Sequence, residues 1–336
     1  MEMIDLCDLW GKLEREVETT GRPGRLKRLV LKEAPCRIFV GISAEDNKRF
    51  FSIQHKTFGL APSDIPRLKG LSVSVEVVDC EGENQQKISF SPGDNSLNAP
   101  FDAFIQDMCD FILKDGNSKN VYSVVLTRLL LWQKFFEKIP AEGLSVVQRQ
   151  GLFGELWLLR KLILDGINLD KCVMAWKGPF AAHQDFVFVN ASIEVKTVSS
   201  KEHQKIRIAS ERQLDERLCR RLYVAQLSIG EVEYKGTSLC DLVCELKKII
   251  GKKASLLTTF EEALISSGYI DVHGNIYKKP KYQIREDKYF HVKDEFPRIR
   301  EDEVRKGVGD ISYTVVISAC LDYIVNYSTV LADIKD

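Results

Sequence analysis

The stretch Asp185-Phe-Val-Phe-Val-Asn-Ala-Ser-Ile-Glu-Val-Lys-Thr197 carries the strongest indication of how this chain folds. Two runs rich in β-branched and aromatic residues, Phe186–Val189 and Ile193–Val198, have the composition of strands. Asn190 and Ala191 separate them, as the two residues of a tight turn would. The sequence therefore predicts a β-hairpin here.

The predicted hairpin brings three charged residues together. With a two-residue turn, Asp185 lies opposite Lys196, and alternation along the strands puts Asp185, Glu194 and Lys196 on one face. The apolar residues of both strands then fill the opposite face. Convergence depends on the register, because a turn longer by one residue would move one strand's charges to the other face.

Two carboxylates and an ammonium on one face suit phosphodiester hydrolysis. Mg²⁺ prefers carboxylate oxygens and water as ligands. A bound Mg²⁺ polarises a phosphate and lowers the pKa of an attacking water. A lysine two residues from one ligand can orient that water or offset charge on the transition state.

The spacing alone is a weak signal, because an acidic residue, any residue and a lysine recur elsewhere. The other instances are Asp46/Lys48, Glu233/Lys235, Glu245/Lys247 and Glu286/Lys288. Glu194 differs from these because it lies in an apolar strand, where an unpaired charge is costly. Glu233/Lys235 is the strongest competitor, since a strand over Leu227–Tyr234 is also plausible. Without further information, a surface hairpin with paired charges explains Glu194 and Lys196 equally well.

A helix is predicted before the hairpin. Ser145 followed by Gln148 forms a capping-box pattern, and the helix continues to about Leu164. Glu155 lies among apolar residues of this helix and is expected to be partly buried. It either approaches the charged face of the hairpin or pairs with Arg149 or Arg160.

The length of 336 residues favours two domains. Strands are predicted at Cys36–Ile42, Arg49–Gln54, Leu71–Val78 and Lys87–Phe90, and later at Lys281–Ile284, Tyr289–Lys293 and Ser312–Ser318. Helices are predicted at 1–20, Phe101–Lys114, Val121–Ile139, Ser238–Ile250 and Ala254–Ser267. With Lys114–Ser118 as the linker, a β-rich N-terminal domain spans 1–118. A second domain then spans 119–336, ending in an α+β extension from about 236.

Bulk composition excludes several classes of protein. Lys plus Arg and Asp plus Glu are both 48, so the net charge of zero does not by itself support DNA binding. The nine cysteines are scattered without zinc spacing and indicate reduced thiols in a cytoplasmic protein. No apolar run approaches the roughly 20 residues needed to cross a bilayer, so no membrane partner is expected.

The order of a helix with Glu155, then Asp185, then Glu194-x-Lys196 resembles the PD-(D/E)XK nuclease superfamily. More closely, the chain resembles a bacterial family of PD-(D/E)XK motif proteins found near restriction-modification and phage-defence genes. The segments that carry this resemblance are Gly151–Leu156, Trp176–Pro179, His183–Phe186, Ile193–Thr197, Ile208–Asp215, Phe296–Ile299 and Gly307-Val308. The likeness covers Leu144 to about Tyr323. Gln184 departs from the superfamily, in which proline often precedes the first carboxylate.

The resemblance implies an α/β fold with a restriction-endonuclease-like core, a mixed central sheet flanked by helices. Carried over by motif, Asp185 and Glu194 are metal ligands, Glu155 approaches the same metal or a second one, and Lys196 is the catalytic lysine. The expected cofactor is Mg²⁺, with Mn²⁺ as a substitute.

The function so implied is a metal-dependent DNA endonuclease in a restriction-modification or phage-defence system. The partners would be DNA and other restriction or defence proteins, and double-strand cleavage by one site would favour a homodimer. The alternative is a catalytically inactive DNA-binding or scaffold subunit of a defence complex. A nuclease that acts on RNA is a third, lower-ranked alternative, because no aromatic RNA-binding motif is visible.

Further residues near the motif are weaker candidates. His183 and Gln213 are each considered as substrate contacts, although a polar loop residue and a helix cap explain them as well. A basic stretch follows the hairpin and is expected to supply a few phosphate contacts: Lys201, Lys205, Arg207, Arg212, Arg217, Arg220 and Arg221. Interspersed acids make a solvated surface the alternative for much of it.

Overall fold

The computed structural model describes residues 5–20, 23–56, 64–80, 82–117, 120–138, 143–180, 182–199 and 205–335. Contacts between residues divide the chain into two compact units. Unit 1 comprises Met1–Gly143 with Ile270–His273, and unit 2 comprises Leu144–Tyr269 with Gly274–Asp336. Each unit has its own sheet, and the two are described separately below.

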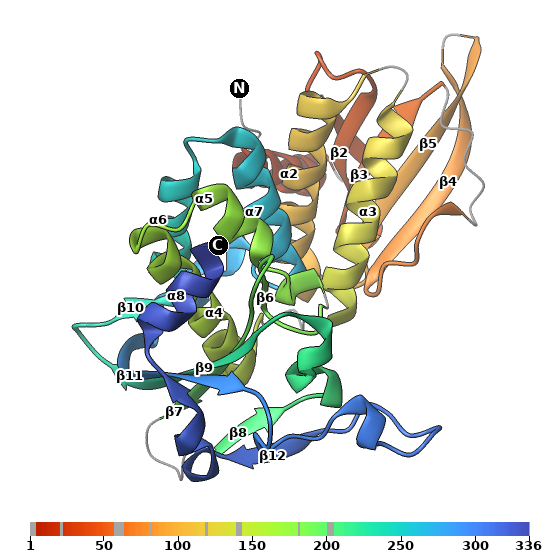
Figure 1. Ribbon diagram of the computed structural model, residues 1–336. Helices are drawn as coiled ribbons and strands as arrows, with labels where there is room; N and C mark the ends of the chain where they lie inside the picture. The colour runs from red at the N-terminus through yellow and green to blue at the C-terminus, as the bar shows by residue number, and fades with distance from the viewer. Residues whose placement is uncertain are drawn as a thin grey trace. The chain divides into compact units, whose positions relative to one another are not determined.

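Unit 1 is an antiparallel five-stranded sheet in the order β1-β2-β3-β5-β4, with helices on one face (Figure 1). Its strands are β1 (Arg25–Val30), β2 (Arg37–Ser43), β3 (Lys48–His55), β4 (Leu71–Cys80) and β5 (Glu83–Pro92). Its helices are α1 (Leu6–Thr20), α2 (Asn98–Asp115) and α3 (Val121–Lys138). Aromatic side chains join the layers, as where Phe104 of α2 packs edge-on against Phe51 of β3 and Trp132 of α3. The β-rich character expected of the N-terminal part is therefore present.

Helix α3 belongs to unit 1, where it lies beside α2 (Figure 1). Asp107 of α2 accepts hydrogen bonds from Arg128 (2.5 Å) and from the Trp132 indole (2.8 Å), both on α3. The unit boundary thus follows Gly143, later in the chain than the boundary after residue 118 that the Lys114–Ser118 composition suggested. Ser118 itself lies outside the described residues. A polar turn between two packed helices looks like a domain linker in sequence, and this explains the difference.

Unit 2 contains a mixed six-stranded sheet in the order β10-β11-β9-β7-β6, with β13 paired to β11. Its strands are β6 (Phe186–Val187), β7 (Ser192–Ser199), β9 (Leu222–Val232), β10 (Thr237–Ser238), β11 (Lys281–Val292) and β13 (Ile324–Val325). β7 and β9 run parallel, whereas β6 and β11 run antiparallel to their neighbours. The predicted mixed α/β architecture is confirmed at this level.

Helices and a small second sheet surround this central sheet. The helices are α4 (Val146–Leu164), α5 (Leu169–Ala175), α6 (Leu239–Ile250), α7 (Ala254–Ser266) and α8 (Tyr327–Lys335), and β8 (Lys205–Ile208) pairs with β12 (Tyr313–Val316). One short 3₁₀ segment, η2 (Asn95–Leu97), belongs to unit 1, and η6 (Asp271–Lys278) begins in the unit 1 segment Ile270–His273. The 3₁₀ segments of unit 2 are η3 (Gly178–Phe180), η4 (Glu211–Leu214), η5 (Glu216–Leu218), η7 (Glu301–Glu303) and η8 (Ile317–Tyr323). Leu222 and Val224 of β9 pack with Ile206, Ile208 and Val315 of the small sheet.

Residues 236–336 contribute to the central sheet itself. β11 pairs with β9 along its whole length, with a bulge between Ile284 and Glu286. The two separate strands predicted over this region are one strand, because the bulge interrupts the alternation without ending the pairing. The segment expected to be an α+β extension thus completes the core of unit 2.

Helix α4 begins as the sequence predicts. Ser145 is its N-cap and forms the full capping box with Gln148, so both orphan donors at the helix start are satisfied. Gly154 brings α4 close to the sheet, because a Cβ at this position would lie 2.1 Å from Thr197 Oγ1. A Cβ at Gly151, in contrast, would meet nothing within 4 Å.

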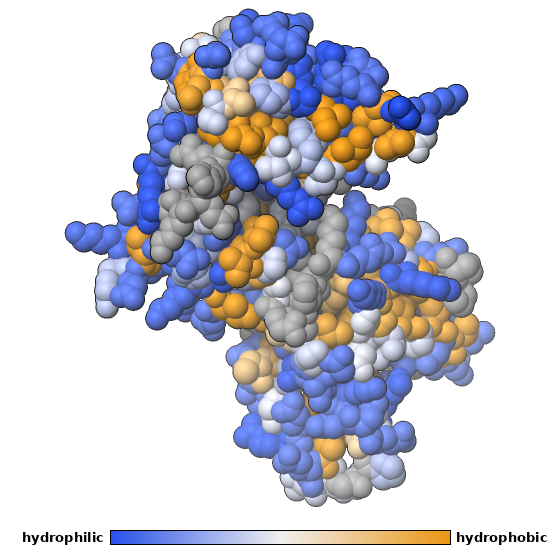
Figure 2. Space-filling model, turned by 90° about the horizontal axis from the view of Figure 1, so that it is seen from below, coloured by the Kyte–Doolittle hydropathy of each residue, from blue (hydrophilic) through white to orange (hydrophobic). Residues whose placement is uncertain are grey.

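The visible surface is mostly polar, with separate apolar patches (Figure 2). Within the described ranges, no helix is both long enough and apolar enough to cross a membrane. None of the nine cysteines forms a disulfide bond.

Candidate active site

The hairpin that opens the site has a different register from the predicted one. Val187 pairs with Ser192, and Phe188 N–H donates to Ala191 O (2.9 Å). The chain therefore turns at Val189 and Asn190, one residue earlier than predicted. Each residue of the first strand is therefore paired two positions earlier on the second strand than predicted, and Asp185 lies opposite Glu194. Because side chains alternate with a period of two, a shift by two residues keeps Asp185, Glu194 and Lys196 on one face.

The backbone around Asp185 is fixed by hydrogen bonds to its neighbours. Its carbonyl oxygen accepts from Lys177 N–H (2.7 Å) and Gly178 N–H (3.0 Å), and its Oδ2 accepts from Val195 N–H (2.7 Å). One carboxylate oxygen is thus tied to the strand that carries Glu194 and Lys196. The other, Oδ1, points toward Gly178.

Glu155 reaches the same place from helix α4. The buried Trp176 indole donates to Glu155 Oε2 (2.7 Å). A Cβ at Gly178 would lie 3.1 Å from this oxygen and 2.7 Å from Asp185 Oδ1. Gly178 therefore leaves the space into which both carboxylates project.

The alternative partners considered for Glu155 bind elsewhere. Arg160 pairs with Glu245 (2.8 Å), and Arg149 donates to the Tyr282 hydroxyl (3.0 Å). Glu155 is therefore directed to the site rather than to either arginine.

Glu194 and Lys196 form an ion pair inside unit 2. Lys196 Nζ lies 2.7 Å from Glu194 Oε1, and the Glu194 side chain is 1% exposed. The second oxygen, Glu194 Oε2, is buried and has no hydrogen-bond partner among the described residues. A buried carboxylate oxygen without a partner is expensive, and a bound ligand would satisfy it.

Burial raises the pKa of all three carboxylates, and the Asp185 charge adds to the rise for Glu194 and Glu155. Burial and the nearby Asp185 carboxylate raise the pKa of Glu194 to about 8, although Lys196 acts against the rise. Burial, then the Asp185 charge, also raises the pKa of Glu155 well above its usual value. Burial likewise raises the pKa of Asp185. Burial disfavours the Lys196 ammonium, but Glu194 and Asp185 more than offset this and raise its pKa.

Gln213 is the second partner of Lys196. Its Oε1 accepts from Lys196 Nζ (3.1 Å) and from Ala209 N–H (2.8 Å). Gln213, a residue of η4, thus links the ammonium to the backbone at Ala209, just before η4. Neither role considered from the sequence included this contact.

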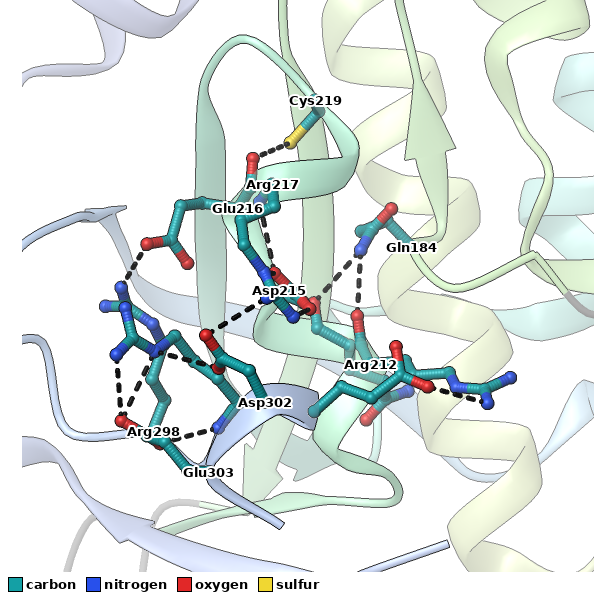
Figure 3. A network of polar contacts seen from close by, with 12 residues as sticks. Gln184, Arg212, Asp215, Glu216, Arg217, Cys219, Arg298, Asp302 and Glu303 are labelled. Atoms are coloured by element: carbon teal, nitrogen blue, oxygen red, sulfur yellow. Dashed lines mark hydrogen bonds and ion pairs between the residues drawn. The ribbon is translucent and has the colours of Figure 1, made fainter. Parts of the chain in front are cut away.

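Gln184, which stands where the superfamily often has proline, also holds η4. Its amide donates to the carbonyl oxygens of Arg212 (3.1 Å) and Gln213 (3.4 Å), and Figure 3 shows it reaching the Arg212 carbonyl. Gln184, in the place of a proline, therefore connects the chain next to Asp185 to η4, whose Gln213 binds Lys196.

Many of the basic residues after the hairpin have acidic partners. Arg217 binds Asp215 (2.6 Å) and Asp302 (3.1 Å) in the network of Figure 3. Arg212 pairs with Glu301 (3.0 Å) and Arg221 with Asp333 (2.7 Å). Lys205 and Arg207 are exposed on β8 and have no carboxylate partner within the described ranges; Lys201 lies outside those ranges.

Two further residues complete the description of the site. His183 is exposed. Gln226 was not anticipated: it is buried beside Lys196 in the β7–β9 register, and neither atom of its amide has a partner among the described residues. A lone glutamine in the apolar run Leu222–Ile229 was the available signal.

The carboxylates of the site have the chemistry of ligands for a divalent cation. In the described part of the chain, no group of three or more His, Cys, Asp or Glu side chains is placed so that it could hold a metal ion. The carboxylates of Asp185, Glu155 and Glu194 nevertheless repel one another beside a single ammonium. Oxygen ligands with excess negative charge are those that hard cations require.

Comparison with known proteins gives the family. The family model described as "Putative PD-(D/E)XK family member, (DUF4420)" matches residues 6–318. Searches of curated proteins and of solved structures each returned no match. The match extends over unit 1 as well as unit 2, so it includes the part for which the motifs gave no specific resemblance. The chain belongs to the DUF4420 family of PD-(D/E)XK proteins.

Proposed function

We propose that this protein is an endonuclease that hydrolyses phosphodiester bonds of DNA with a divalent metal ion. Its family supports a nuclease-like function. The observation that carries the proposal is the unpartnered Glu194 Oε2, buried beside Lys196 in a site that Asp185 and Glu155 also enter. We also propose that unit 2 is a restriction-endonuclease-like core.

The carboxylates of Asp185, Glu194 and Glu155 would hold the ion, which is Mg²⁺ with Mn²⁺ as a substitute. The chemistry supplied by such an ion is polarisation of the phosphate and activation of a water molecule. Lys196 keeps its proton because two carboxylates stabilise the ammonium. It can therefore donate a hydrogen bond to a phosphate oxygen and offset the charge that develops there.

A plasmid-cleavage assay with matched variants tests this proposal. Asp185→Asn keeps an oxygen that can accept from Val195 N–H but removes the charge, and Lys196→Ala removes the ammonium. We expect each to lower the cleavage rate by about 10²–10³-fold, as loss of a charge-stabilising group does. Lys247→Ala is the control, because Lys247 belongs to a Glu-x-Lys triplet on α6 and pairs with Glu261 (3.2 Å).

Calorimetric titration of Mg²⁺ and Mn²⁺ with the same proteins separates the two candidate functions. Ion binding by wild type that is lost in Asp185→Asn supports the nuclease. Equal cleavage by wild type and Asp185→Asn would contradict the role of Asp185 as a metal ligand. A folded wild type that neither binds the ions nor cuts DNA would favour the inactive DNA-binding or scaffold subunit.

We propose that the enzyme acts in the cytoplasm in restriction or phage defence, together with other proteins of such a system. The support is the resemblance of its motifs to a family found near such genes. A homodimer would let one site per chain cut both strands. Light scattering of the purified protein, with and without DNA, measures whether it is a monomer or a dimer.

A further inference from the structure

A pocket of about 620 Å³ lies in unit 1, apart from the residues proposed for hydrolysis. Strands β1, β2, β3 and β5 each contribute a lining side chain, including Arg37 and Gln54, which pair in register. Because Phe51 packs on α2 and strand residues alternate, Gln54 points to the opposite face of the sheet. The volume lies within the range typical of small-molecule and cofactor sites.

The rim of the pocket is positively charged. Lys32, Arg37 and Lys56 line it and are exposed. Lys56 pairs with Glu83, and Arg37 donates to the Cys80 thiol. Within the described ranges, neither Lys32 nor Arg37 has a carboxylate partner, so both charges remain to attract an anion. Arginine and lysine side chains are the usual protein partners of phosphate oxygens.

The interior of the pocket carries amides and apolar surface. The Gln54 amide, which is 6% exposed, donates to Gln85 Oε1 (2.9 Å), so the two amides hold each other in place. Glutamine amides recognise base edges that present a donor beside an acceptor. Leu29 and Pro35 add apolar wall, against which a flat ring can pack.

We propose that this pocket binds one nucleotide, with its base against Gln54, Gln85 and the apolar wall, and its phosphate on Lys32 and Arg37. The combination of rim cations with interior amides suits a nucleoside phosphate better than a phosphate alone, which would need no amide pair. A base turned out of a DNA strand and a free nucleotide share this chemistry. Either way, the site lies in unit 1 and goes beyond the proposed hydrolysis.

Binding measured in EDTA tests the pocket independently of cleavage. The probes are the four deoxynucleoside monophosphates and a short single-stranded DNA of mixed sequence, titrated into the full chain. We expect binding to weaken about tenfold in Arg37→Ala and in Gln85→Leu, since each removes hydrogen bonds to the ligand. Lys134→Ala removes an exposed cation from α3 and is expected to bind like wild type.

Mononucleotide binding in EDTA makes the result independent of the proposed active site, because wild type, Arg37→Ala and Gln85→Leu all keep that site unchanged. Tighter binding of the DNA strand than of the mononucleotides, with both weakened in Arg37→Ala and Gln85→Leu, would identify a base within a strand as the ligand. Equal binding of mononucleotides and strand would identify a free nucleotide. Failure of every probe to bind, or binding unchanged in folded Arg37→Ala and Gln85→Leu, would overturn the proposal. Circular dichroism and thermal melting verify that the variants fold.

Discussion

At the scale of single residues, Gly178 controls the space available to the candidate site. Gly178→Ala would place a methyl group 2.7 Å from Asp185 Oδ1, closer than a carbon atom can approach an oxygen, and 3.1 Å from Glu155 Oε2, a tight contact. We expect displaced carboxylates, with cleavage reduced by about 10²-fold, as misplacement of reacting groups by about 1 Å can cause. Cleavage rate and Mg²⁺ affinity measure the effect.

Gly151→Ala is the matched control for that change. A Cβ at Gly151 meets nothing within 4 Å, and alanine is favoured over glycine in a helix by roughly 0.5–1 kcal/mol. The variant should melt at a higher temperature and cut at the wild-type rate. Equal activity of Gly178→Ala and Gly151→Ala would contradict the importance of the space at Gly178.

Gln213 should act as a positioning residue for Lys196. Gln213→Leu removes the oxygen that accepts from Lys196 Nζ at 3.1 Å, so we expect cleavage to fall about tenfold, the effect of losing one hydrogen bond to a charged group. Gln213→Glu keeps an acceptor and should recover most of the rate. If both variants lose equal activity and stability, Gln213 contributes only to the fold of η4.

At the scale of elements, β8 offers the cations best placed to contact DNA. Lys205 and Arg207 alternate with the buried Ile206 and Ile208, so both project from the exposed face of the strand. Neutralising both to alanine should weaken DNA binding and lower the slope of log affinity against log salt by about 2, since two fewer counterions are released. Mg²⁺ binding should be unchanged.

The matched comparison uses two arginines that already have acidic partners. Arg212 and Arg221 are paired with Glu301 and Asp333, so replacing both with alanine should change the salt slope less than the β8 variant does. The opposite order would show that the ion pairs open when DNA binds. Filter binding or fluorescence anisotropy over a range of salt concentrations distinguishes these outcomes.

Elements with strong local signals were predictable, whereas register was not. The start of α4 followed from Ser145 and Gln148 because a capping box is satisfied within one turn. The hairpin turn was placed one residue late because its position depends on contacts from outside: Ala191 is buried and Val189 is 84% exposed, and Arg220 donates to Asn190 Oδ1 (2.9 Å). The shared face of Asp185, Glu194 and Lys196 was still correct, since the error was an even number of positions.

The remaining site contacts could not be predicted because they join distant parts of the chain. Glu155 meets Trp176 through the packing of α4 and α5, and Gln213 meets Lys196 through the fold of η4. Spacing along the sequence reports neighbours on one helix or strand, but it contains no information on such contacts. The boundary between the two units differs from the predicted one for a related reason, since Asp107 ties α2 to α3 across a polar turn.

At the scale of the whole molecule, the candidate site should make stability depend on pH. The pKa of Glu194 rises from 4.5 to about 8 in the folded protein, so the folded state keeps a proton that the unfolded state releases between these values. The free energy of unfolding of the metal-free protein should therefore fall as the pH rises through this window. Glu194→Gln should weaken that dependence and stabilise the protein most at about pH 9, while the raised pKa values of Glu155 and Asp185 keep part of it.

Thermal melting in EDTA across this pH range measures the effect, and Glu233→Gln, which changes an exposed glutamate after β9, is the matched control. Added Mg²⁺ should stabilise wild type more at high pH, because the ion replaces the proton as the partner of the carboxylates. A Glu194→Gln protein with the same pH dependence as wild type would show that another group causes it.

The contact between Gly154 and Thr197 has a consequence for how the sequence can evolve. A methyl group at position 154 would overlap Thr197 Oγ1, so an alanine in α4 there requires the Thr197 side chain to move or position 197 to become smaller. Relatives with alanine at position 154 should therefore carry glycine or alanine at position 197. Either change made alone should be selected against. These two positions, far apart in the chain, are expected to vary as a pair.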